Sequence, residues 1–336
     1  MRAVVLRQHG GIEALTYEEN FPDPSPEAGQ VVVRVRATSI NYHDVFTTKG
    51  MPGIKVPFPC IIGLDIAGEI ASVGPAVAGN WKPGDRVLVD PLNLKRIGLH
   101  GETLPGGCAE LCPVDEGQLV PIPDGVSFQQ AAALPVAYGS AYRMMMTHGK
   151  IKAGEKVLIL GASGGVGSCC VQLAKIAGCE VVACGSTPEK LAALKAMGAD
   201  HVIDYKAQDF AKAIFELYDK PHRRFYTGGV DVAVNFTGGD TWVPSLRCLK
   251  RGGRLLTCGA TAGFDPKEDL RFIWTFELQI LGSNSWARQD LADLLELVRV
   301  KKLDPIIETV LPLENTREAV RKVRDREVIG KIVIAP

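Results

Sequence analysis

Residues 156–167, KVLILGASGGVG, constrain the fold of this chain more than any other segment. The apolar run 157–160 predicts a buried strand of a parallel sheet, and residues 168–177 beyond the glycines predict a helix. A strand, a tight glycine turn and a helix in this order bind anions, because the turn exposes the backbone and the helix N-terminus carries free N–H groups. The sequence therefore predicts a dinucleotide-binding turn made by Ser163, Gly164, Gly165, Val166 and Gly167.

Composition argues against several kinds of partner. The chain has 336 residues, enough for two domains, and its 38 lysines and arginines balance 38 aspartates and glutamates. This balance provides no basic surface for nucleic acid or an anionic membrane, and no apolar run reaches the roughly 18 residues of a membrane span. The opening residues, MRAVVLRQHGG, predict a strand and not a signal peptide. We therefore expect a cytoplasmic protein that acts on a small molecule.

The nine cysteines do not form the pattern of a disulfide framework. Their number is odd, and most of them fall inside predicted strands and helices, as is typical of buried free thiols in a reducing compartment. Only Cys108 and Cys112 lie close together in a loop, and no second pair follows at the spacing of a zinc site. The sequence therefore predicts no structural metal.

Residues 1–127 are rich in short predicted strands separated by turns. Strands are expected at 3–6, 31–37, 86–89 and 106–111, with two further short pieces within 61–73. Residues 39–44 open a short helix that Gly50 and Pro52 end, and residues 90–105 form a long polar loop. This pattern predicts a compact, barrel-like β domain.

After residue 127 the pattern changes to helices at 128–134 and 141–147 and then to alternating strands and helices. Strands are predicted at 156–160, 180–184, 201–203, 230–235, 253–258 and 278–282. Helices are predicted near 165–177, 188–196, 207–218, 240–248 and 268–276. Residues 128–284 should therefore form an α/β domain with a doubly wound parallel sheet. The tail, 285–336, should return to the first domain with two helices (287–301 and 314–325) and two strands (306–310 and 332–334).

The end of the second strand of this alternation bears on the choice of nucleotide. Sites that prefer NAD carry an Asp or Glu there, and residues 181–187 contain none. Gly185 leaves room for a 2′-phosphate, Ser186 can donate to it, and Lys190 can supply a cation, although Lys190 could equally be an ordinary surface lysine. Tyr205 either flanks the adenosine phosphate or is an exposed loop residue. We predict NADP(H), and expect Gly185→Asp to shift the preference toward NADH.

The motifs SINYHD, GLDIAGEIASVG, KPGDRV, AAALPVAYGSAYRMM, GASGGVG and GKIVIAP together resemble those of the medium-chain dehydrogenase/reductase superfamily over nearly the whole chain. The chain is most similar to the zinc-free quinone oxidoreductases and the related NADPH-dependent alkene or enoyl-thioester reductases. This resemblance implies a GroES-like catalytic domain (1–127), a Rossmann domain that binds NADP (128–284) and a C-terminal return (285–336). It also implies a homodimer joined at the edge strand 278–282.

The resemblance also implies that the catalytic zinc of the alcohol dehydrogenases is missing. The positions of its three ligands hold Asn41, Leu64 and about Ala132, with Asp65 at the place of a nearby acid. Leucine and alanine cannot bind zinc. An improvised metal site at His43 with Asp44 or Asp65 is an alternative that lacks a third ligand. Without a metal to polarise a carbonyl, we expect hydride transfer to a conjugated double bond. The enolate that develops in this reaction can be stabilised by hydrogen-bond donors.

The resemblance suggests roles for individual residues. Asn41 would lie near the nicotinamide, while Tyr42, His43 and Tyr138 are candidate donors or proton sources; delivery of the proton from solvent remains open. Phe46 stands where related quinone reductases often have a tyrosine. Further residues that resemble cofactor-binding positions are Ser140, Asn235, Thr237, Gly259, Ala260, Ser283, Asn284 and Lys331.

We therefore predict an NADPH-dependent oxidoreductase that transfers hydride to a quinone, an α,β-unsaturated carbonyl compound or an enoyl thioester without zinc. Three alternatives remain. The chain could act on a carbonyl like an alcohol dehydrogenase, carboxylate an enoyl thioester reductively, or bind NADPH with little turnover.

Overall fold

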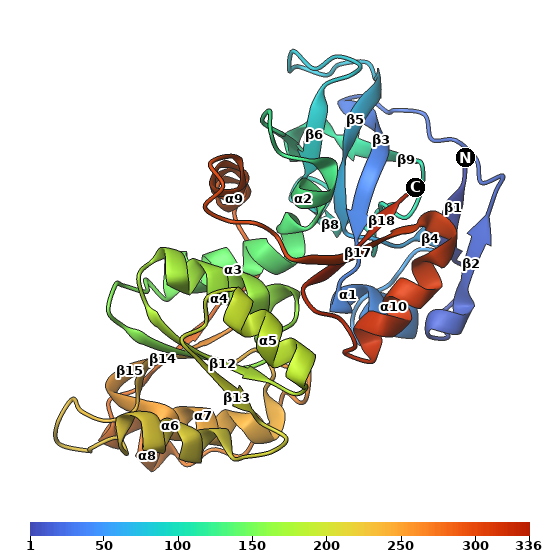
Figure 1. Ribbon diagram of the computed structural model, residues 1–336. Helices are drawn as coiled ribbons and strands as arrows, with labels where there is room; N and C mark the ends of the chain where they lie inside the picture. The colour runs from blue at the N-terminus through green and yellow to red at the C-terminus, as the bar shows by residue number, and fades with distance from the viewer. The chain divides into compact units, whose positions relative to one another are not determined.

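The computed structural model describes residues 1–336 and divides into two compact units (Figure 1). The first unit comprises Met1–Ala137 and Ala287–Pro336, and the second comprises Tyr138–Trp286. Residues 128–137, which the sequence assigns to the nucleotide-binding domain, group with the first unit because α2 (Phe128–Ala132) packs on strands of that unit. None of the helices combines the length and the apolar character that crossing a membrane requires.

The second unit is built on a six-stranded parallel sheet, which confirms the doubly wound prediction. The strand order is β13-β12-β11-β14-β15-β16. The strands are β11 (Lys156–Ile159), β12 (Glu180–Gly185), β13 (His201–Asp204), β14 (Val230–Val234), β15 (Leu249–Thr257) and β16 (Gln279–Gly282). The order reverses direction between β11 and β14, and ligands of such sheets bind outside the carboxyl ends of the strands at this point.

Helices cover both faces of this sheet, with α4 and α5 on one side and α6, α7 and α8 on the other (Figure 1). Their bounds are α3 (Ser140–Tyr142), α4 (Gly165–Ile176), α5 (Pro188–Ala196), α6 (Phe210–Tyr218), α7 (Trp242–Cys248) and α8 (Leu270–Thr275). Because both faces are covered, the central strands are apolar on both sides: Val157, Leu158 and Ile159 are fully buried. The central strands therefore stand out in the sequence as continuous apolar runs.

The first unit contains a seven-stranded sheet in the order β10-β6-β5-β3-β18-β17, with β9 also paired to β3. A three-stranded sheet, β2-β1-β4, and a hairpin, β7-β8, complete its strands. The strands are β1 (Ala3–Leu6), β2 (Leu15–Glu18), β3 (Gln30–Ser39), β4 (Cys60–Ile61), β5 (Asp65–Val73), β6 (Arg86–Val89), β7 (Leu92–Asn93), β8 (Gly98–Leu99), β9 (Leu111–Asp115), β10 (Leu119–Pro121), β17 (Ile307–Pro312) and β18 (Lys331–Ala335). Its remaining helices are α1 (Tyr42–Lys49), α9 (Arg288–Arg299) and α10 (Thr316–Arg324).

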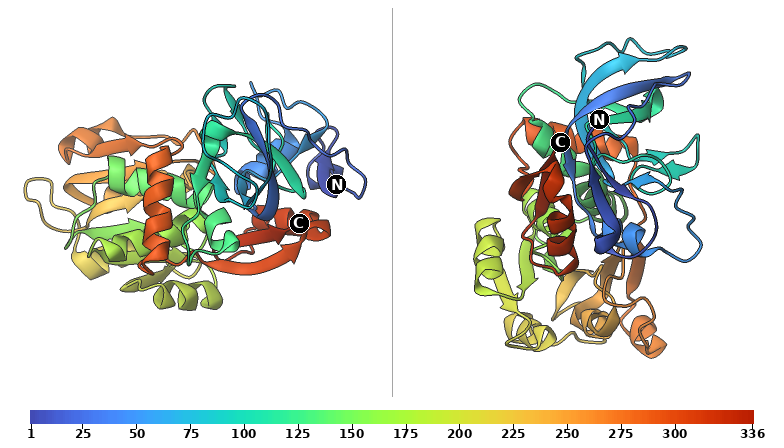
Figure 2. Two further views of the ribbon diagram at one scale, coloured as in Figure 1. Left: turned by 90° about the horizontal axis from the view of Figure 1, so that it is seen from above. Right: turned by 90° about the vertical axis from the view of Figure 1, so that its right-hand side faces the viewer.

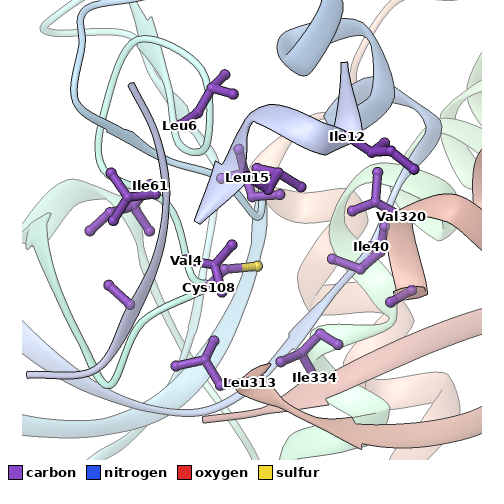
Figure 3. Close-up of a cluster of buried hydrophobic side chains, with 14 of the residues drawn as sticks. Val4, Leu6, Ile12, Leu15, Ile40, Ile61, Cys108, Leu313, Val320 and Ile334 are labelled. Carbon is purple, nitrogen blue, oxygen red and sulfur yellow. The ribbon is translucent and has the colours of Figure 1, made fainter. Parts of the chain in front are cut away.

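The two ends of the chain share one sheet and one core in this unit. Strand β18 pairs antiparallel with β3, and Figure 2 shows the C-terminal segment beside the N-terminal strands. Figure 3 shows the core they enclose, where Val4 and Leu6 of β1 lie in one cluster with Leu313 and Ile334 from the C-terminal segment. The C-terminal segment is therefore an integral part of the first unit.

Three local predictions for the first unit and one for the second were wrong or incomplete. The strand expected at 106–111 begins only at Leu111. Residues 106–108 instead donate irregular backbone hydrogen bonds to the carbonyl groups of Ile61, Gly63 and Ile62, and a Cβ at Gly106 would lie 2.3 Å from the Ile62 carbonyl oxygen. The polar loop 90–105 contains the hairpin β7-β8, and strand β2 was missed. The helix expected at 141–147 exists, but residues Arg143–His148 are wound as a π-helix.

Strand β16 is one of the two edges of the parallel sheet, opposite β13, and most of it is exposed. An edge strand offers unpaired backbone groups to a second chain. The homodimer expected from the sequence would use this edge, and it remains a prediction.

Candidate functional site

The glycine turn between β11 and α4 has one closely packed side and one open side. A Cβ on Gly167 would lie 2.3 Å from the Gly161 carbonyl oxygen and 2.5 Å from the Ala162 Cα, so only glycine lets α4 pack on the turn. A Cβ on Gly164 would meet nothing closer than 3.8 Å. The backbone at Gly164 is therefore open to a ligand.

The N-terminus of α4 supplies donors to that open side. The N–H of Ser168 bonds the Gly164 carbonyl at 2.8 Å, which starts the helical pattern. The N–H groups of Gly165, Val166 and Gly167 precede this bond, as free donors do in the first turn of a helix. Together with the positive end of the helix dipole they suit a pyrophosphate. Ser163, also predicted for this site, lies two residues before Gly165.

Three residues predicted to surround an adenosine phosphate gather at the carboxyl ends of β12 and β13. The N–H of Tyr205 bonds the Gly185 carbonyl at 3.2 Å, and Tyr205 is 47% exposed. Ser186 follows Gly185 directly, and Lys190 lies in the first turn of α5. The nearby carboxylate of Asp204, at the end of β13, accepts the backbone N–H of Lys206 at 2.9 Å. Two hydroxyl groups and a lysine thus share this corner of the second unit.

The prediction that Gly185 makes room for the phosphate needs correction. A Cβ on Gly185 would point at Leu191 and Leu194, at 3.0 and 3.3 Å from their methyl groups. A side chain here would therefore begin against the apolar contact between β12 and α5 and not in open space. Ser186, the next residue, stays the predicted donor to the phosphate.

A cavity of about 490 Å³ lies at the carboxyl ends of β15 and β16. It brings together four residues that the sequence predicted as cofactor contacts: Gly259, Ala260, Ser283 and Asn284. The Ser283 hydroxyl is buried and has no hydrogen-bond partner in the chain, so a ligand in this cavity could supply one. Sequence reasoning missed the other walls of the cavity, which include Trp242, Cys258, Phe264 and Pro266.

Asn235, predicted to contact the cofactor, has its side chain engaged inside the second unit. Its Nδ2 donates to Thr241 and Ser245 at 3.1 and 2.9 Å, and its Oδ1 accepts the N–H groups of Thr237 and Gly238 at 3.0 and 2.9 Å. The side chain therefore shapes the turn after β14, which places the backbone of Thr237 and Gly238.

Tyr138 and Ser140 lie at the start of the second unit. Tyr138 is fully buried, and its hydroxyl lies 3.4 Å from the Ser168 hydroxyl of α4. In this position it supports the helix that carries the glycine turn. Ser140 is partly exposed at the first position of α3.

The first unit has a buried polar cluster made by residues far apart in the sequence. Asp65, at the start of β5, accepts the Ser39 hydroxyl at 2.6 Å, the Asn41 side-chain amide at 2.8 Å and the Val136 N–H at 2.9 Å. The Lys331 ammonium donates to the Ile40 carbonyl at 3.0 Å and to the Asn41 Oδ1, and lies 3.4 Å from Asp65. Asn41 thus uses its amide for donation and acceptance within the first unit.

Lys331 is 3% exposed, and burial lowers the pKa of its ammonium while the charges of Asp65 and Asp44 oppose that effect. Its three N–H groups match the three acceptors, so the cluster is internally satisfied. The sequence analysis named Asn41, Asp65 and Lys331 separately but did not predict that their side chains form one hydrogen-bonded cluster.

Asp44 lies beside this cluster and holds the start of α1. Its carboxylate accepts the N–H groups of Asn41 and Gly63 at 2.8 and 2.9 Å. Burial raises the pKa of Asp44 to about 6. The two hydrogen bonds from backbone N–H groups and the charge of His43 lower this pKa, while the charge of Asp65 raises it.

His43 pairs with Glu102, a residue that the sequence did not predict for the site. The imidazole Nε2 lies 2.7 Å from the Glu102 Oε2, and the carboxylate is nearly buried. Tyr42 is partly buried and packs edge-on against Phe46, with ring centroids 5.1 Å apart. Of the candidate proton donors in the first unit, only His43 is paired with a carboxylate.

The residues present do not fit a metal centre. No group of three or more His, Cys, Asp or Glu side chains in residues 1–336 could hold a metal ion. Leu64 and Ala132, at the places of two zinc ligands by resemblance, are buried and have no ligand atoms, and His43 faces Glu102 and not Asp44 or Asp65. All nine cysteines are free, and Cys258 alone is not fully buried.

Two family models match the chain. Residues 27–124 match the alcohol dehydrogenase GroES-like domain, and residues 165–299 match a model described as zinc-binding dehydrogenase. The first match falls in the first unit, and the second begins at the first residue of α4, covers the strands of the parallel sheet other than β11, and ends with α9.

Individual relatives are similar over most of their length. A crotonyl-CoA reductase of Streptomyces avermitilis is 30% identical, with 95% of this chain and 82% of the relative covered. An acryloyl-coenzyme A reductase of Sulfurisphaera tokodaii is 29% identical, with 95% and 96% covered. A solved structure of an NAD-dependent alcohol dehydrogenase superposes with a TM-score of 0.90 at 32% identity, and both chains are fully covered.

Proposed function

The chain belongs to the medium-chain dehydrogenase/reductase superfamily of oxidoreductases, and from this premise we propose that it uses NADPH, without a metal, to reduce a conjugated carbon–carbon double bond. The acceptor is an α,β-unsaturated carbonyl compound, foremost an enoyl thioester, with quinones as the related second class. The relatives named as crotonyl-CoA and acryloyl-coenzyme A reductases support the thioester.

The second unit supports binding of a nicotinamide dinucleotide. The open backbone at Gly164 and the N-terminus of α4 fit its pyrophosphate, and the orphan hydroxyl of Ser283 lines a cavity at the ends of β15 and β16. Ser186, Tyr205 and Lys190 lie where a 2′-phosphate needs donors. When bound, NADPH supplies the hydride.

The observation that carries the choice of acceptor is the polar cluster of the first unit. At the positions of the zinc ligands stand Asn41, tied to Asp65 and Lys331, and the buried apolar residues Leu64 and Ala132. Reduction of a simple ketone needs strong polarisation of its carbonyl by a Lewis acid, and these residues offer no set of ligands to bind one. A conjugated acceptor needs less, because its developing enolate can be stabilised by hydrogen bonds.

Acceptor panels test this proposal directly. We expect NADPH oxidation with short-chain 2-enoyl thioesters, enals or quinones at rates at least about 100-fold above those with saturated ketones, a difference of about 2.7 kcal/mol in the barrier. Treatment with a chelator should leave the rate unchanged, and metal analysis should find less than stoichiometric zinc. Faster turnover of saturated ketones, or activity that zinc restores after chelation, would overturn the proposal. Absence of turnover with every acceptor, alongside NADPH binding, would favour a binding protein.

A change of cofactor preference tests the role of Ser186. Ser186→Asp places a carboxylate at the end of β12, where it repels a 2′-phosphate and can accept the ribose hydroxyls of NADH. We expect the ratio of kcat/KM for NADPH over NADH to fall by about 100-fold, equivalent to roughly 2.7 kcal/mol. Gly185→Asp is the matched control: its side chain would meet Leu191 and Leu194, so we expect lower stability without a clean change of preference. An unchanged ratio in Ser186→Asp would contradict the proposed phosphate site.

A further inference from the structure

We propose that His43 and Glu102 form a carboxylate–imidazole pair in which His43 delivers the proton that completes alkene reduction and Glu102 positions it. This inference rests on the proposed function, and adds a proton donor and a positioning residue to it. The pair lies entirely in the first unit, on α1 and on the turn that follows β8.

The burial of Glu102 is the first support. Its side chain is 9% exposed, and its carboxylate makes one side-chain hydrogen bond, at 2.7 Å to the His43 Nε2. A buried carboxylate is unfavourable unless it is paired, and the partner of Glu102 is the imidazole of His43. The His43 side chain is 27% exposed, so the ring has one nitrogen against the carboxylate and retains access to solvent.

The backbone holds both partners in place. Gly101 (φ 74°) packs so closely on Gly63 that a Cβ would lie 2.8 Å from its carbonyl carbon. The N–H of Gly63 in turn bonds the Asp44 carboxylate at 2.9 Å, and Asp44 directly follows His43 on α1. The turn bearing Glu102 and the helix bearing His43 are thus joined through Gly63. Such fixed geometry is what a proton donor and its orienting group need.

The pair has a defined protonation chemistry. With Nε2–H donated to Glu102, the Nδ1 of neutral His43 is an acceptor, and in the imidazolium it carries a transferable proton. A carboxylate in this position orients the ring and stabilises the imidazolium, as in catalytic triads. His43 can therefore act as an acid through Nδ1 while Glu102 holds the ring through Nε2.

The reduction balances with one hydride and one proton. A bound NADPH would supply the hydride that adds to the β-carbon, and the π-electron pair of the double bond would shift toward the carbonyl to form an enolate. The Nδ1 proton of His43 and the electron pair of this enolate then form the new C–H bond at the α-carbon. NADP⁺ and a neutral imidazole result, and solvent reprotonates the imidazole. Besides Glu102, the titratable neighbours of this pair are Asp44 and Cys60; burial raises the pKa of Cys60 to about 12, so it remains a thiol.

Three variants test the pair. His43→Gln removes the acid, and we expect kcat to fall by about 100-fold. Glu102→Gln keeps an oxygen that can accept the Nε2–H but removes the charge, so we expect about a tenfold loss in kcat with little change in KM. The double variant should be no slower than His43→Gln, because the two residues act as one unit. Glu180→Gln is the matched control, since it alters another carboxylate–imidazole contact, with His201 at 3.2 Å, outside the site.

Two readouts separate proton delivery from a merely structural role. In D₂O the wild type should place deuterium on one face of the α-carbon, and His43→Gln should lose this facial selectivity. In the free protein, a downfield imidazole N–H signal protected by Glu102 should be present in the wild type and the control, and absent in His43→Gln. In Glu102→Gln, where a neutral amide oxygen replaces the carboxylate, the signal should move upfield and lose its protection from exchange.

The outcomes distinguish the two proposals. A wild type without alkene turnover would overturn the proposed function. A wild type that turns over, with variants that keep its rate and facial selectivity, would overturn the role of His43 and leave the function standing. Loss of the N–H signal without any change in rate or selectivity would show that Glu102 supports structure alone.

Discussion

Gly167→Ala is expected to weaken NADPH binding by at least about 100-fold, or roughly 2.7 kcal/mol, and to lower the free energy of unfolding by about 1–3 kcal/mol. The added Cβ would lie 2.3 Å from the Gly161 carbonyl oxygen and 2.5 Å from the Ala162 Cα. Both atoms belong to the backbone, so α4 itself must move away from the turn. Its N–H groups would then no longer converge on the pyrophosphate. Fluorescence titration with NADPH and thermal unfolding measure the two effects.

Gly164→Ala serves as the matched control for this result. Its Cβ would meet no atom closer than 3.8 Å, so the fold should keep its stability. The methyl group would nevertheless project from the open side of the turn, and we expect a loss of NADPH affinity alone. The two variants thus separate packing from ligand approach. NADPH affinity at the wild-type level in Gly167→Ala would show that the cofactor does not bind at this turn.

The second unit could be predicted closely from the sequence because its strands, helices and glycine turn are determined by residues that are close together in the chain. Strands such as β11 are buried on both faces and therefore stand out as apolar runs, and the glycines of the turn are required by close backbone contacts. The direction of a side chain was not predictable in the same way. Gly185 was interpreted as open space, whereas its Cβ direction faces Leu191 and Leu194 across the contact with α5.

The first unit was predictable as a β domain but not in its polar centre. Ser39, Asp65 and Lys331 stand at the ends of β3, β5 and β18, and only the pairing of these strands brings them together. The partner of His43 was missed for a similar reason. Glu102 lies in a polar loop in which the sequence analysis assigned it no role at the site, and its position depends on the contact of Gly101 with Gly63. Non-local contacts of this kind leave no periodic signal.

Lys331→Met is expected to lower the free energy of unfolding by about 3–5 kcal/mol, because removing one partner of a buried ion pair leaves the other charge uncompensated. The ammonium is 3% exposed and serves the Ile40 carbonyl, Asn41 and Asp65. For a protein of 336 residues, with an unfolding entropy of about 0.7 kcal/mol/K, the loss corresponds to a melting temperature lower by roughly 4–7 °C. Lys95→Met, at the exposed tip of the β7-β8 hairpin, is the control and should melt like the wild type.

A double variant shows whether charge or packing causes this loss. In Lys331→Met with Asp65→Asn, the uncompensated carboxylate is replaced by an amide of the same shape, which can still accept the Val136 N–H and exchange hydrogen bonds with Ser39 and Asn41. We therefore expect the double variant to be more stable than Lys331→Met by about 1–3 kcal/mol. Losses that simply add, as measured by chemical denaturation of the four proteins of the cycle, would refute the electrostatic account. The loss would then come from the missing hydrogen bonds of Lys331 to the Ile40 carbonyl and to Asn41, and not from the uncompensated charge of Asp65.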